Sequence, residues 1–562
     1  MVTKLIQFIH REVAGIHQAA YVLGVFALSS QLLGLLRDRL LAGLFGASRT
    51  LDVYYAAFRI PDLLFLTVAS IVSLSVLLPF FVERLERDRE TAKIFLDRVF
   101  SIFFLTVSVL SIVAFFAMPY VLPLIFPGFA GSDLAQAISL SRLLLLSPIL
   151  LGISNLLAAV TQAHQRFLLY AISPLLYNLG IIAGGIAVFF EPSLGITGVV
   201  YGVLFGAVLH LVVQVPFVIS KGFLPRFTFS WNTPEIWRVL FYSAPRRIAL
   251  SINHIAIIFL ISIASLMAEG SIAIFQFSFN LQSVSLSIIG ASYSVAAFPA
   301  LTRLFAKGDM QTFLQQFTTA ARHIVFWALP LTALFIVLRA QIVRTILGSG
   351  SFDWADTRLT AAALALFIIS LVFQALMLLF VRGYFAVGNT RTPFLINITS
   401  GAVMVVSAFG LWYLFEASVL FRTVLGTALR VTDLDGIIVL VLPLAYTLGF
   451  LLNGVLLWFW FERDFGHSLK GVFSSFWQSL AGAVLTGLTA YGSLQVLSGF
   501  FDLNTFLGIF LQGACAGLVG ASAGLGVLWL LGSSELNELW SSLSRRFGRK
   551  NVVASGTDTL EN

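Results

Sequence analysis

Long apolar runs alternate along the chain with short stretches that hold charges, Gly, Pro or clustered polar residues. A helix needs about 20 mostly apolar residues to cross a bilayer, and most of the runs reach that length. When the chain is divided at the polar stretches, the pattern predicts fourteen membrane-spanning helices. Their expected ranges are 15–43, 53–81, 98–125, 136–161, 168–190, 195–219, 241–267, 271–300, 312–338, 358–387, 393–415, 437–461, 472–499 and 503–532.

The composition of the chain supports a membrane location. Of the 562 residues, 59% are hydrophobic and 11% are charged, whereas soluble domains carry roughly 25% charged residues. The mean hydropathy is +0.95. We therefore expect an all-α polytopic membrane protein in contact with membrane lipids. The net charge of +8 is scattered between apolar runs rather than gathered in one patch, so no nucleic-acid partner is expected.

The positive charges in the short loops predict the orientation of the helices, because cytoplasmic loops collect Lys and Arg. With the N-terminus inside, most of the 34 Lys and Arg residues fall in cytoplasmic loops and tails. The opposite loops hold only Arg49, Arg344, Arg358, Arg422 and Arg430. The first 30 residues lack the small-residue cleavage site of a signal peptide, so the first helix is expected to be retained. Both termini are therefore expected in the cytoplasm.

Two short sequence patterns recur at nearly the same distance. "SPLLYN" and "TPFLIN" align Pro174 with Pro393, and "SVLLPFFVERL" and "SVAAFPALTRL" align Pro79 with Pro299. The two offsets are 219 and 220 residues. Each pair matches helices that are six spans apart, and an even shift keeps the direction through the membrane. The pattern predicts two parallel six-helix lobes followed by two extra helices, which is a transporter architecture.

This repeat sets the expected domain boundaries. They are an N-terminal lobe at 1–220, an interfacial connector at 221–240, a C-terminal lobe at 241–466, a helix pair at 467–540 and a disordered cytoplasmic tail at 541–562.

Charged residues in the first predicted hairpin mark a candidate binding site, because charges at membrane depth are usually paired and functional. Arg59 and Asp62 are three residues apart and share one helix face, which favours a paired or cavity-lining role. A second pair, Arg246 and Arg247, opens the seventh predicted helix, which takes the place of the first helix in the other lobe. Both clusters could face one central cavity. The candidates in the first hairpin are Arg37, Asp38, Arg39, Asp52, Arg59 and Asp62.

A plainer interpretation stays open for two of these groups. The charges at 37–39 could mark the outer end of the first helix, and Arg246 and Arg247 the cytoplasmic start of the seventh. An arginine-rich cavity would instead suit an anionic headgroup, because guanidinium binds phosphate through two parallel hydrogen bonds and stays charged. The histidines have no metal-ligand spacing, and no phosphate-binding loop or nucleophile motif occurs. No metal or cofactor is therefore expected.

The stretch "SSQLLGLLRDRLLAGLFGASRTLDVYYAAFRIPDLL" resembles the first hairpin of the MurJ (MviN) lipid II flippases of the multidrug/oligosaccharidyl-lipid/polysaccharide (MOP) exporter superfamily. "FPGF" near residue 126 and "RFLLYAISPLLYNLG" are similar to later segments of the family, and fourteen spans in two lobes plus two helices fit throughout. The matching positions of the first hairpin are Ser30, Gly34, Arg37, Asp38, Phe45, Gly46, Asp52, Phe58, Arg59 and Pro61.

The resemblance implies a transporter rather than an enzyme. Members of the family translocate the undecaprenyl-diphosphate-linked peptidoglycan precursor, lipid II, across the bacterial cytoplasmic membrane by alternating access. By this resemblance Arg37 and Asp38 are cavity residues that bind the headgroup, and Asp52 and Arg59 support them. Helices 13 and 14 would carry the lipid tail, and cell-wall synthesis proteins are a further class of partner to consider.

The chain also departs from the family pattern. Three cavity arginines that are usual in the family are replaced by Gln31, Phe65 and Asn280. Asn280 is therefore a candidate substrate-binding position. Arg246 and Arg247, at a place where the family is ordinarily apolar, could restore part of the lost positive charge.

Three other functions stay open at this point. One is export of another polyprenyl-linked glycan. A membrane-embedded glycosyltransferase or polymerase would need a catalytic carboxylate on the outer side, where only Asp353, Asp356, Asp433 and Asp435 are candidates, all on short loops. The lost arginines suggest the third, a non-transporting scaffold for wall synthesis.

Overall fold

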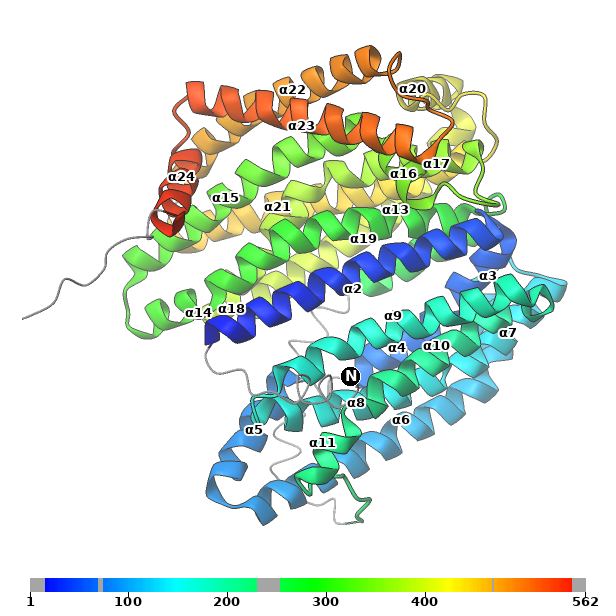
Figure 1. Cartoon of the computed structure of the whole chain (residues 1–562), viewed down its shortest axis with the longest axis vertical. Coiled ribbons are helices and arrows are strands. Elements are labelled where there is room, and N and C mark those ends of the chain that lie inside the picture. Colours follow the sequence, from blue (N-terminus) through cyan, green and yellow to red (C-terminus); the bar gives the residue numbers. More distant parts are fainter. Residues whose placement is uncertain (1–15, 69–73, 230–252, 467–468, 548–562) are drawn as a thin grey trace, which may run out of the picture. The chain divides into compact units, whose positions relative to one another are not determined.

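A computed structural model of the whole chain gives the fold (Figure 1). The structure describes residues 16–68, 74–229, 253–466 and 469–547. Arg246 and Arg247 lie outside the described residues, as does most of the connector expected at 221–240. The described chain is helical, and it contains no strand. The expected all-α polytopic fold is therefore confirmed.

The helices follow the predicted apolar runs closely. Up to residue 220 they are α2 (Ile16–Phe45), α3 (Arg49–Ala57), α4 (Arg59–Val68), α5 (Leu74–Arg87), α6 (Arg89–Ile125), α7 (Gly131–Leu144), α8 (Leu146–Ala163), α9 (Phe167–Phe190), η1 (Pro192–Leu194), α10 (Gly195–Val212) and α11 (Val215–Ser220). Next come a helix at Asn253–Ser265, α13 (Ser271–Leu286), the π-helical segment η2 (Ser287–Ala291), α14 (Ser292–Ala306), α15 (Met310–Val337), α16 (Arg339–Leu347), α17 (Trp354–Ile369) and α18 (Leu371–Ala386). The last are α19 (Arg391–Ala417), α20 (Val419–Leu429), η3 (Ile437–Leu440), α21 (Val441–Phe465), α22 (Lys470–Leu497), α23 (Phe506–Leu530) and α24 (Ser534–Phe547).

Ten helical stretches of the described residues are long and apolar enough to cross a membrane. The pair α17 and α18, which is interrupted at Ser370, brings the number to eleven if it counts as one span. The three other expected spans coincide with α2, with the broken series α3 to α5, and with the helix at Asn253–Ser265. The observed helices are therefore consistent with fourteen spans.

The chain groups into two compact units. The first comprises Met1–Val284, Ile342–Ser370 and Gly388–Leu457, and the second comprises Ser285–Gln341, Leu371–Val387 and Trp458–Asn562. Several borders fall inside membrane-spanning segments, next to η2, at the interruption after Ser370 and within α21. The lobes expected at 1–220 and 241–466, which follow from the sequence repeat, stay a prediction.

Two of the helix breaks have a proline as their cause. A proline in a helix clashes with the carbonyl group four residues earlier and cannot donate to it. Pro61 stands four residues after Ala57, where α3 ends, and Pro148 stands four residues after Leu144, where α7 ends. The freed carbonyl oxygen of Ala57 accepts a hydrogen bond from Oγ of Ser141 at 3.0 Å. The second predicted span is therefore a broken helix whose interruption lies close to Arg59.

Glycines bring α22 and α23 into close contact, and the two helices lie side by side (Figure 1, orange). A Cβ atom at Gly520 would approach the carbonyl oxygen of Thr486 to 2.7 Å, and one at Gly524 would approach Oγ1 of the same threonine to 1.9 Å. Gly520 and Gly524 are four residues apart, the spacing of small residues that lets two helices pack closely in a membrane.

Within the second unit, the amphipathic helix α24 is attached to α15 by one ion pair and one contact between a histidine and a carboxylate. Nε of Arg322 donates to Oε1 of Glu535 at 2.7 Å, and Nε2 of His323 lies 2.9 Å from Oε2 of Glu538. Burial alone would raise the pKa of Glu535, but hydrogen bonds from Ser533, Ser475 and Arg322 outweigh it and lower the pKa to about 2. The helix continues through residue 547, into the segment expected as a disordered tail, because its leucines recur at helical spacing.

Candidate binding cavity

A small polar cavity lies within the first unit, among α2, α3, α4, α9 and α13. Its volume is about 280 Å³. Of the residues expected at a binding site, Arg37, Arg59, Asp62 and Asn280 line it, although they come from three separate helices. The remaining lining residues are Leu41, Tyr54, Tyr55, Phe58, Tyr177, Ile181 and Gln276.

Arg37 is held on one side of the cavity by a buried carboxylate. Its Nη2 and Nε atoms donate to Oδ1 of Asp38 at 2.7 and 2.9 Å, and Nη1 donates to Oδ1 of Asn178 at 3.3 Å. Asp38 is 2% exposed, and its other oxygen accepts from Nδ2 of Asn280 at 2.9 Å. Asp38 therefore orients Arg37 and offsets its charge rather than facing the cavity itself.

Arg59 has a different environment from Arg37. Its Nη2 donates to Oε1 of Gln276, a neutral side chain, and the amide of Gln276 donates to Oδ1 of Asn280 at 2.7 Å. No carboxylate in the described part of the chain forms an ion pair with Arg59, and its buried Nε has no hydrogen-bond partner there. The buried hydroxyl of Tyr55 likewise has no partner among these residues. Arg59 is therefore the side chain whose positive charge is most available to an anion.

These contacts form one continuous polar chain. It runs from Asn178 through Arg37, Asp38, Asn280 and Gln276 to Arg59, and so links α9, α2, α13 and α4. A ligand that bound at either arginine would therefore change the hydrogen bonds of four helices.

Two of the expected site residues have other partners. Both carboxylate oxygens of Asp52 accept from the backbone at the start of α13, from Gly270 N at 2.8 Å and Ala273 N at 2.9 Å. A carboxylate at a helix N-terminus satisfies free N–H groups and interacts favourably with the helix dipole. Nη1 of Arg39 donates to the carbonyl oxygens of Thr345 and Ile346. Neither side chain is among those that line the cavity.

Sequence reasoning missed several residues of this site. Gln276 stands four positions before Asn280 and so shares its helix face, and Asn178 belongs to the repeated "SPLLYN" pattern. Tyr54, Tyr55 and Phe58 pack edge to face and form an aromatic wall. No group of three or more potential metal ligands occurs among the described residues. The cavity thus offers charged and neutral donors to an anionic group.

Comparison with known proteins identifies the family. A sequence profile described as "Lipid II flippase MurJ" matches residues 41–512. The chain belongs to the MurJ family. A relative from Burkholderia cenocepacia described as "Lipid II flippase MurJ" is 24% identical over 518 residues, which cover 90% of this chain and 96% of that protein.

Two solved structures show the same fold. One is a lipid II flippase MurJ in an inward closed conformation, at 20% identity and a TM-score of 0.69, covering 89% of this chain and 98% of that one. The other is an inward-facing multidrug resistance MATE family transporter of the MOP superfamily, at 16% identity and a TM-score of 0.62, covering 78% of this chain and 96% of that one. This MurJ-family chain therefore has the fold of MOP superfamily transporters.

Proposed function

We propose that the chain is a lipid II flippase of the bacterial cytoplasmic membrane. It moves the undecaprenyl-diphosphate-linked peptidoglycan precursor from the inner to the outer leaflet by alternating access, with both termini in the cytoplasm. Family membership and the flippase description of the Burkholderia cenocepacia relative support this proposal. In this proposal the chain transports its lipid without chemical change, so it is a transporter and not an enzyme.

The observation that carries the proposal is the state of Arg59. Arg59 is a buried guanidinium with an unsatisfied Nε, and among the described residues no carboxylate lies within ion-pair distance of it, although Asp62 is near enough to interact with its charge. This favours an external anion, because a buried charge at membrane depth is costly. A diphosphate carries the negative charge that would offset the guanidinium, and its oxygens accept two parallel hydrogen bonds from it. Arg37 faces the same cavity and supplies a second guanidinium.

We assign distinct roles to the site residues. Arg59 and Arg37 bind the diphosphate, Asp38 and Asn280 position Arg37, and Asp62 limits the positive charge of the cavity. A volume of about 280 Å³ suits a small anionic group rather than the whole sugar–peptide head, so the transport cycle requires a wider state. Arg246 and Arg247 supply positive charge from the C-terminal lobe. Arg39 and Asp52 act on the protein backbone rather than on the lipid.

The decisive experiment has two parts: complementation of a flippase-depleted bacterium, and flipping of fluorescent lipid II in liposomes. We expect wild-type protein to complement and to flip, Arg59→Gln to lose both activities, and Arg59→Lys to recover little because lysine lacks the two-pronged contact. Arg84→Gln is the control, since it removes one positive charge outside the cavity. Normal flipping by Arg59→Gln, at matched insertion into the membrane, contradicts the proposed role of Arg59.

A second candidate is export of another polyprenyl-linked glycan, which the neutral residues Gln31 and Asn280 favour, since the family usually has arginine there. The same liposomes distinguish the two. Faster flipping of a different undecaprenyl-diphosphate glycan than of lipid II would support this candidate. Absence of flipping for every lipid tested, with complementation retained, would support a scaffold that works with cell-wall synthesis proteins.

A further inference from the structure

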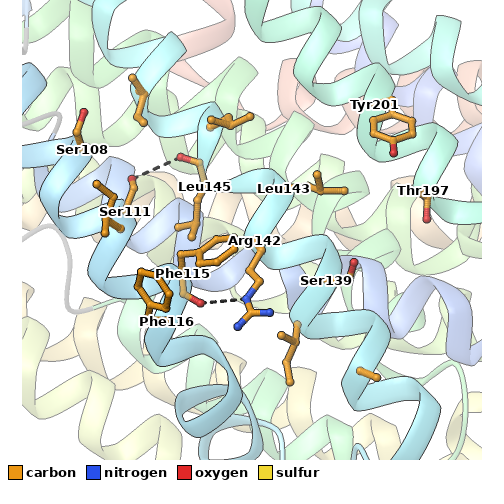
Figure 2. A pocket seen from close by; sticks show the side chains of 15 residues that line it. Ser108, Ser111, Phe115, Phe116, Ser139, Arg142, Leu143, Leu145, Thr197 and Tyr201 are labelled. Atoms are coloured by element: carbon orange, nitrogen blue, oxygen red, sulfur yellow. Dashed lines mark hydrogen bonds between the residues drawn. The ribbon is translucent and has the colours of Figure 1, made fainter.

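A second and larger hollow lies in the first unit, in a groove bordered by α6, α7, α8 and α10 (Figure 2). Its volume is about 850 Å³, within the range of small-molecule sites. None of the residues that line it lines the cavity around Arg37 and Arg59. Most of its wall is apolar, and Arg142 is the one charged side chain of the lining.

The length and composition of its helical stretch place Arg142 inside a candidate membrane span. It stands in the 33-residue span Gly131–Ala163, which is about 50 Å long, whereas the hydrocarbon core is about 30 Å thick. When the span is centred on the hydrocarbon core, about 10 Å of helix lies outside the core at each end. The Cα of Arg142 is roughly 16 Å along the helix from Gly131 and therefore about 6 Å inside the core. Arginine at such a depth costs a few kcal/mol unless it has a polar partner.

The partners of Arg142 satisfy only part of its guanidinium. Nε donates to the carbonyl oxygen of Phe115 at 3.0 Å, and the guanidinium carbon lies 4.5 Å from the centre of the Phe115 ring (Figure 2). Within the described ranges, Arg142 forms no ion pair, and no hydrogen bond from its Nη atoms occurs. These donors therefore remain available to an anion in the groove.

Hydroxyl groups and exposed apolar side chains complete the groove. Ser139 on α7 and Thr197 and Tyr201 on α10 bring hydroxyls to the lining (Figure 2). Phe116 is 68% exposed and Leu146 is 51% exposed, so the groove continues into an apolar surface at membrane depth. An occupant that fits both the polar lining around Arg142 and this apolar surface needs an anionic head and a hydrocarbon chain.

We propose that this groove is a binding site for one anionic glycerophospholipid. Its phosphate accepts hydrogen bonds from the Nη atoms of Arg142, the hydroxyls contact the headgroup, and one acyl chain lies along Leu146 and Phe116. A phosphodiester carries a single negative charge, which one arginine offsets, whereas a diphosphate carries more. In the proposed topology the lipid belongs to the outer leaflet. The bound phospholipid is thus a structural lipid of this protein and not its cargo.

The chain offers a closely matched control. Arg422 also donates to the carbonyl oxygen of a phenylalanine, Phe415, and its guanidinium lies 5.2 Å from that ring, but Arg422 does not line the groove. Arg142→Gln and Arg422→Gln therefore remove the same charge and a similar phenylalanine contact, although Nη2 of Arg422 also donates to the carbonyl oxygen of Glu416. Ser139→Trp fills the groove without changing charge, and Arg142→Lys keeps the charge.

The test is native mass spectrometry of the purified full chain with phosphatidylglycerol or phosphatidylcholine of identical acyl chains. We expect wild type and Arg422→Gln to bind phosphatidylglycerol about tenfold more tightly than phosphatidylcholine. Arg142→Gln should lose this preference, and Arg142→Lys should retain most of the preference. Ser139→Trp should weaken the binding of both lipids. An unchanged preference in Arg142→Gln, or unchanged binding of both lipids by Ser139→Trp, overturns the proposal. Displacement of phosphatidylglycerol by an equal concentration of undecaprenyl diphosphate overturns the assignment to a phospholipid.

Discussion

Replacing Arg37 by alanine should affect both folding and transport, and the structure allows the two effects to be separated. Arg37 and Asp38 form an ion pair of 2.7 Å with side-chain exposures of 25% and 3%. Removing the arginine leaves the Asp38 carboxylate buried, with Nδ2 of Asn280 as its remaining side-chain donor among the described residues. Breaking such a pair costs about 3–5 kcal/mol, and a Coulomb estimate at 4 Å with an effective dielectric constant of 20 gives about 4 kcal/mol.

The double variant Arg37→Ala/Asp38→Ala removes the stranded carboxylate together with its partner. The thermal unfolding midpoint is measured in detergent by tryptophan fluorescence. We expect Arg37→Ala to lower this midpoint and the double variant to recover most of the loss. Flipping of fluorescent lipid II in liposomes should be absent in both, because both lack the guanidinium that faces the cavity. Normal flipping by the double variant would refute this reasoning and leave Arg37 only as the partner of Asp38.

The ion pair between Arg322 and Glu535 provides the matched control. It has the same length, 2.7 Å, and side-chain exposures of 24% and 2%, but it joins α15 to α24. Arg322→Ala should lower the unfolding midpoint less than Arg37→Ala does, since Ser475 and Ser533 still donate to Glu535. Flipping per folded molecule should be unchanged. A loss of flipping in Arg322→Ala equal to that of Arg37→Ala would show that stability alone explains the transport defect.

Three further predictions follow from other contacts. Asn280→Asp places a second carboxylate beside Asp38 in place of the 2.9 Å hydrogen bond, so flipping in liposomes should fall at least about tenfold while Asn280→Gln retains most of it. Asp52→Ala removes two hydrogen bonds to the start of α13 and should lower the free energy of unfolding by about 3 kcal/mol, whereas flipping per folded molecule stays normal. The lowered pKa of Glu535 means that its ionised form stabilises the attachment of α24 above about pH 4.5, and that this contribution is lost as the pH falls toward 2. Cleavage of α24 by an acid-active protease should therefore rise steeply over that interval, and Arg322→Ala should move the rise to higher pH.

The sequence predicts the spans well because hydropathy determines where a helix leaves the membrane. The helix expected at 168–190 is observed at Phe167–Phe190, and the one expected at 312–338 is observed at Met310–Val337. Pro61 and Pro148 explain the breaks near Phe58 and Leu145 once the structure is known. Proline alone does not predict a break, because Pro79, Pro174 and Pro299 lie inside continuous helices. The interruption at Ser370 has no proline four residues later, and the sequence gives no signal for it.

The site is only partly predictable from the sequence. Arg37, Arg59 and Asp62 stand out because they are charged within an apolar region, and all three line the cavity. The role of Asp52 depends on backbone groups more than 200 residues away, and no local pattern reveals such a contact. The link from Arg59 to Gln276 is equally distant in sequence. Charge alone could not distinguish residues that face the cavity from residues that hold the walls together.

The π-helical segment η2 has a consequence for the register of its membrane crossing. Each residue of an α-helix advances about 100° around the axis, and a π turn takes up roughly one residue more than an α turn. Within the second unit, the side chains that follow η2 are therefore shifted by about 100° from the positions that an uninterrupted α-helix would give them. A helical wheel drawn with a constant step of about 100° from Ser285 onward would place Pro299 on the wrong stripe of α14. Deleting one residue within Ser287–Ala291 should let the crossing continue as one α-helix and turn a different set of α14 side chains toward its neighbours. An alignment of this chain with a relative whose crossing is uninterrupted should accordingly open a single-residue gap at this point.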